Sequence, residues 1–73
     1  MNWFMVEIFK TNIHDVLQAK KIITLLHRHF PEYLFNFDLH DCDKILRVKG
    51  ESIPVDEIVS LVSANGFYCR VLD

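Results

Sequence analysis

The 73-residue chain predicts an α+β fold with the element order β-α-β-β-α-β, and three observations support this prediction. Two segments repeat apolar residues at the helical spacing of three and four positions, and four short segments alternate residues as strands do. The glycine and proline residues are Pro31, Gly50, Pro54 and Gly66, and each falls where an element is expected to end. We therefore expect one domain over residues 1–73, without a linker or an internal repeat.

The first half of the chain is expected to form a strand and a long helix. β-Branched and aromatic residues alternate over Met5–Thr11, which is typical of a strand. Apolar residues recur every three or four positions over Val16–Phe30, which indicates an amphipathic helix that Pro31 ends. Asp15 precedes this helix and Gln18 lies three residues later, which is the spacing of a capping box that satisfies free amides at a helix start.

The second half is expected to form a hairpin, a helix and a last strand. The hairpin strands are Tyr33–Leu39 and Lys44–Lys49, with a polar turn between them. The helix begins at or near Pro54 and ends at Asn65-Gly66, because glycine readily adopts the left-handed conformation that closes a helix. Tyr68–Leu72 is the last strand.

This order of elements predicts the ferredoxin-like architecture, a four-stranded antiparallel sheet with two helices on one face. Right-handed crossovers place the first and third strands in the middle of the sheet. The topology then gathers three connections at one pole: Asn12–Asp15, His40–Asp43 and Asn65–Phe67. Because this architecture carries many unrelated functions, the fold alone names no activity.

Each strand is expected to turn one row of side chains to the helices and one row to the open face. The row expected under the helices consists of Val6, Ile8, Phe35, Phe37, Leu46, Val48, Cys69 and Val71. The open face is expected to carry Phe9, Leu34, Ile45, Tyr68 and Leu72. Among these, Phe9, Ile45 and Tyr68 come from adjacent strands and could form an apolar contact surface for a protein partner or a second copy of the chain.

Composition and charge exclude several function classes. Eight Lys and Arg against ten Asp and Glu give a net charge of −2, whereas a nucleic-acid surface needs clustered positive charge. No apolar run approaches the length of a membrane span, and a basic signal-peptide start is absent, so a cytoplasmic location is expected. With two glycines and no catalytic triad or paired carboxylates in an apolar setting, neither an enzyme nor a cofactor site is expected.

Four local features carry a resemblance to a known family. They are Ala19-Lys20-Lys21-Ile22, Phe35-Asn36-Phe37-Asp38-Leu39, the apolar stripe over Ile58–Val62, and Asn65-Gly66-Phe67. From Val6 to Leu72 the chain resembles the heavy-metal-associated domain of copper chaperones and metal-transporting ATPases. The resemblance implies the ferredoxin-like fold.

The chain departs from this family at the metal loop. The family holds a soft monovalent metal with a Met-x-Cys-x-x-Cys motif, because polarizable thiolates prefer ions such as Cu(I). Counted back from Ala19, the cysteine positions fall on Asp15 and Gln18, and the methionine position falls on Ile13. The resemblance therefore implies a degenerate member that has lost the thiolate site, and copper delivery does not carry over.

The expected loop pole still contains other candidate metal ligands. They are His14, Asp15, His40, Asp41, Cys42 and Asp43. A divalent ion such as zinc accepts imidazole, thiolate and carboxylate together, so a zinc-like site is the alternative to protein contact. Solvated turn residues and a helix cap explain the same side chains, because polar residues are common at hairpin tips and helix starts. The first hypothesis is therefore a non-enzymatic domain that acts through its open sheet face.

Overall fold

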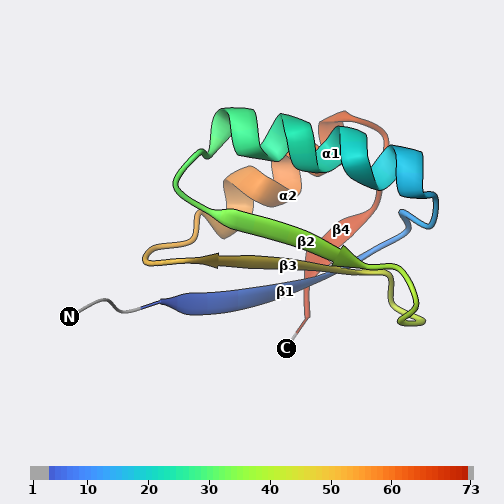
Figure 1. Ribbon diagram of the computed structural model, residues 1–73, viewed down its shortest axis with the longest axis horizontal. Helices are drawn as coiled ribbons and strands as arrows, with labels where there is room; N and C mark the ends of the chain where they lie inside the picture. The colour runs from blue at the N-terminus through green and yellow to red at the C-terminus, as the bar shows by residue number, and fades with distance from the viewer. Residues whose placement is uncertain (1–3, 73) are drawn as a thin grey trace.

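The computed structural model describes residues 4–72 and confirms the expected order of elements (Figure 1). The elements are β1 (Met5–Thr11), α1 (Val16–His29), β2 (Leu34–Asp38), β3 (Ile45–Gly50), α2 (Val55–Ala64) and β4 (Cys69–Val71). Most of the helix and strand ends differ from the sequence prediction by one residue. Neither helix within these residues is both long and apolar enough to cross a membrane.

The four strands form an antiparallel sheet in the order β2-β3-β1-β4, so β1 and β3 are central as expected. Figure 1 shows α1 and α2 on the same side of this sheet, while no helix of residues 4–72 covers the opposite side. The fold is therefore the ferredoxin-like α+β arrangement, with one covered face and one open face.

The prediction of which β1 side chains point to the helices is wrong. Phe9 is fully buried in the core, whereas Val6 is 53% exposed. Phe9 pairs with Leu46, which is also fully buried, and Ile8 pairs with the exposed Arg47. Because side chains alternate along a strand, this register turns Phe9 to the helices and both Val6 and Ile8 to the open face.

The physical reason is that β1 is apolar on both faces, so its alternation alone does not select one. Two hydrogen bonds that Thr11, the last residue of β1, makes with residues outside the strand favour the observed orientation. The Thr11 hydroxyl donates to the carbonyl of Lys44 at 2.6 Å and accepts from the amide of Ile13 at 3.1 Å, which fixes the end of the strand. Phe9 also removes more apolar surface from water than Val6 does.

The helix ends follow the local sequence signals. The Asp15 carboxylate accepts a hydrogen bond from the Leu17 amide at 3.0 Å, which confirms its role as the N-cap of α1. Within residues 4–72 no side-chain hydrogen bond from Gln18 completes the expected capping box. At the end of α2, Gly66 has a φ of 89°, and the amides of Gly66 and Phe67 donate back to Ser63 and Val62. This is the closure expected of Asn65-Gly66.

Candidate interaction surface

The loop pole forms as the topology predicts. The amide of Thr11 donates to the carbonyl of Asp43 at 3.1 Å, which joins the end of β1 to the β2–β3 turn. The side chain of Asn12 accepts from the amide of Tyr68 at 2.8 Å, which joins the same end of β1 to the start of β4. Polar side chains in this region are thus already part of the connections between elements.

Within the described residues 4–72, the three potential metal ligands that cluster are Asp41, Cys42 and Asp43. Their ligand atoms lie within 4.8 Å of one another, at the β2–β3 turn. Of the six candidate ligands predicted from sequence, Asp41, Cys42 and Asp43 form this group, whereas His14, Asp15 and His40 lie outside it. The structure therefore brings half of the predicted set together, and no imidazole is among them.

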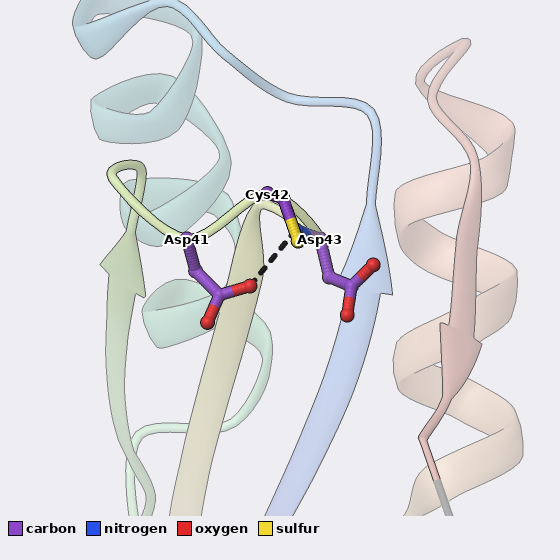
Figure 2. Close-up of side chains that lie close together, drawn as sticks. All are labelled: Asp41, Cys42 and Asp43. Atoms are coloured by element: carbon purple, nitrogen blue, oxygen red, sulfur yellow. Dashed lines mark hydrogen bonds between the residues drawn. The ribbon is translucent and has the colours of Figure 1, made fainter.

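The carboxylates of this turn have structural partners (Figure 2). Asp41 accepts from the amide of Asp43 at 2.8 Å, and its carbonyl accepts from the amide of Lys44 at 3.0 Å. The carboxylate of Asp43 lies on the β1 side, 3.4 Å from the ammonium of Lys10. Asx turns of this kind are a common way to build a hairpin tip. The cluster is accounted for by the turn, and nothing further indicates a bound ion.

The two cysteines are free thiols in contrasting surroundings. Cys42 is exposed at the hairpin tip, while Cys69 is buried at the start of β4, on the core side as expected. Burial raises the pKa of the Cys69 thiol from 9.0 to about 11, because a thiolate is poorly solvated there. Neither cysteine has the electropositive, accessible setting of a reactive thiol.

The apolar patch expected from Phe9, Ile45 and Tyr68 does not form. Phe9 lies on the covered face, as described above. Ile45 does lie on the open face, since it pairs with Lys10 and Asp38, but only 4% of it is exposed. Tyr68 is 48% exposed and lies just before β4. Tyr68 is thus the one member of this trio that offers substantial surface.

Other apolar side chains take the place of that patch. Strand register puts Leu34, Lys49 and Val6 in one row across the open face, from β2 through β3 to β1. Leu34 and Val6 are both more than half exposed. Phe35, next to Leu34, is partly buried against the core. Two large apolar side chains are therefore accessible at this end of the sheet.

A pocket of about 200 Å³ lies among these residues. Its apolar lining consists of Val6, Leu34 and Phe35, and Asn36, Arg47 and Lys49 supply its polar lining. The sequence pattern did not identify Val6 as an open-face residue because β1 was given the wrong face, and Lys49 was not singled out although the faces of β3 were predicted correctly. The alternation in β3 already indicates this basic surface. Leu46 and Val48 point to the core, so Ile45, Arg47 and Lys49 point to the open face.

The open face is also richer in basic than in acidic side chains. At the paired strand positions it carries Lys10, Arg47, Lys49 and Arg70 against the carboxylate of Asp38. Within the described part of the chain, the ion pairs are Lys10 with Asp43 at 3.4 Å and Arg47 with Asp38 at 3.5 Å. Lys49 belongs to neither pair, and its ammonium lies 5.5 Å from the ring centroid of Phe4.

We compared the chain with protein-family models, with curated proteins and with solved structures, and none of them matches it.

Proposed function

We propose that this chain is a non-enzymatic, heavy-metal-associated-like domain that acts by binding a protein through its open sheet face. The observation that carries the proposal is the exposure of Leu34 and Val6, 65% and 53%, on either side of an apolar pocket. Paired exposed apolar side chains around a hollow are a common feature of protein contact sites, since an anchor side chain can be buried there.

The loss of the metal loop supports the same proposal. Asp15 stands at one of the family's thiol positions and caps α1 through its carboxylate. The described thiols are Cys69, which is buried, and Cys42, which lies on a different connection. An exposed free thiol persists most readily in a reducing compartment, which favours a cytoplasmic location.

Site-specific photo-crosslinking tests the proposal. A photoreactive amino acid at position 34 should join the chain to a discrete protein in the cells that make it, or to a second copy. The same amino acid at Thr24, an exposed position on α1, is the matched control and should give no such adduct. A Val6→Ser substitution should reduce the adduct at position 34, because it removes one of the exposed apolar side chains that line the pocket.

Two results would contradict the proposal. The first is a chain that gives no adduct at position 34. The second is the same set of adducts from positions 34 and 24, because the open face would then have no preference for a partner over the outer surface of α1. A thermal melt of each variant should show an unchanged fold, since both positions are exposed.

A further inference from the structure

The charge on the open face points to the chemistry of its partner, and this inference rests on the proposed function. We infer that the open face binds an acidic protein segment that carries a large apolar side chain. The apolar side chain would enter the pocket between Val6 and Leu34, and carboxylates beside it would meet Lys49 and Arg47.

The pocket combines the two kinds of group that such a segment needs. The exposed side chains of Val6 and Leu34 provide an apolar lining, while Arg47 and Lys49 supply cationic groups to the same pocket. Lys49 is exposed and has no carboxylate partner within the described residues, so its charge is available to a ligand. Its ammonium lies over the ring of Phe4 in a cation–π contact, which leaves the positive charge uncancelled.

A second copy of the chain fits this face poorly. A symmetric dimer through the open sheets would place the basic strand rows of the two copies, Arg47 and Lys49 among them, against one another. Like charges brought together at an interface are repulsive, and that repulsion suppresses the wrong partner. Charge complementarity therefore selects a different chain with excess acidic residues.

RNA is also anionic, but the face lacks what a sheet needs to bind bases. Sheets that bind RNA stack bases on aromatic side chains of the central strands. The corresponding open-face positions are Val6, Ile8 and Lys10 on β1 and Ile45, Arg47 and Lys49 on β3. None of these six is aromatic, whereas an apolar pocket suits a leucine or phenylalanine anchor.

Fluorescence anisotropy with synthetic peptides tests the inference. The probe is a short labelled peptide in which Asp and Glu flank one leucine. Two matched peptides replace the leucine by alanine or the acidic residues by lysine. The acidic leucine peptide should bind most tightly, and its affinity should fall as salt rises from about 50 to 500 mM, because exposed charges are screened.

Charge reversal then locates the contact. Lys49→Glu combined with Arg47→Glu should weaken binding about tenfold or more, since two attractive contacts become repulsive. Lys20→Glu combined with Lys21→Glu makes the same change of charge on α1 and should leave affinity nearly unchanged. Because Arg47 also pairs with Asp38, Lys49→Glu alone is the second variant, and it disturbs no ion pair of the described residues.

Three outcomes would overturn the inference. One is equal weakening by the two double variants, which would mean attraction to overall charge. Another is tighter binding of a labelled uridine oligomer than of the acidic peptide, which would identify a nucleic-acid surface. The third is no peptide binding while crosslinks at position 34 still form; the proposed function would then stand and only the acidic partner would be rejected.

Discussion

Asp15 is the residue on which the start of α1 depends. Its carboxylate satisfies the Leu17 amide, one of the donors that a helix leaves without an intrahelical partner. Asp15→Ala should therefore lower the free energy of unfolding by about 0.5 to 2 kcal/mol, measured by urea denaturation. Asp15→Asn keeps an oxygen acceptor and should lose much less. If the alanine variant is as stable as the parent, Asp15 does not stabilise the helix start, and a functional role becomes the better explanation of this residue.

Cys69 should make stability depend on alkaline pH. Its thiol pKa is raised to about 11 in the folded chain from an ordinary value of 9.0. Between pH 9 and about 11 the unfolded chain loses this proton while the folded chain keeps it, so stability falls as pH rises. The contribution of the protonated thiol to stability is fully present below pH 9 and is lost progressively as pH rises through about 11.

The measurement is urea denaturation of the parent and of Cys69→Ala at several alkaline pH values. All other ionisable groups are the same in the two chains, so the difference between their unfolding free energies isolates the Cys69 thiol. A difference that stays constant from pH 8 to 11 would show that Cys69 is accessible to water. Thiol labelling at pH 8 gives an independent check, since Cys42 should react and Cys69 should not.

At the scale of one strand, the orientation of β1 predicts that truncating two of its apolar side chains will change stability by different amounts. Phe9→Ala should destabilise the fold by about 3 to 5 kcal/mol, because it leaves a cavity in the core. Val6→Ala should change stability by no more than about 1 kcal/mol, because Val6 is largely exposed. Thermal and urea denaturation compare the two variants. A larger loss of stability from Val6→Ala than from Phe9→Ala would instead support the sequence prediction, in which Val6 lies under the helices and Phe9 on the open face.

The end of β3 requires glycine for lack of space. A Cβ at Gly50 would clash with the ring of Tyr33, whose hydroxyl donates to the carbonyl of Ser52. Since the tyrosine ring is held at both ends, Gly50→Ala should cost about 1 to 3 kcal/mol by overpacking. In a Tyr33→Leu background the same substitution should cost much less, as a double-mutant cycle would measure. Additive effects would mean that the ring does not constrain this position.

At the scale of the whole molecule, the positions of the thiols predict that Cu(I) is not held tightly. Two thiolates must meet at one ion, but Cys69 is buried and protonated at neutral pH, and Cys42 lies on the hairpin tip. Competition with a Cu(I) chelator should leave the chain without bound copper. Retention of one copper per chain against micromolar competitor would contradict this expectation. Cys42→Ala would then show whether the exposed thiol is responsible.

Much of the architecture could be predicted because local signals and topology agree. The Asp15 cap, the Gly66 turn and the alternating segments mark where elements begin and end, and handedness leaves few ways to join them. The core row of β3 was likewise predicted correctly, because Leu46 and Val48 alternate with the charged, exposed residues Arg47 and Lys49. Such patterns are local in the chain, so the sequence alone was sufficient for them.

The facing of β1 and the composition of the open face were decided by tertiary structure. Over Met5–Thr11 both rows contain apolar residues, and a shift of one residue exchanges the two faces completely. Pairing of Phe9 with Leu46 and anchoring of Thr11 to Lys44 select one of them. Only then do Val6 and Leu34 share a face with Lys49, because that neighbourhood is made by three strands distant in sequence and by no pattern within one strand.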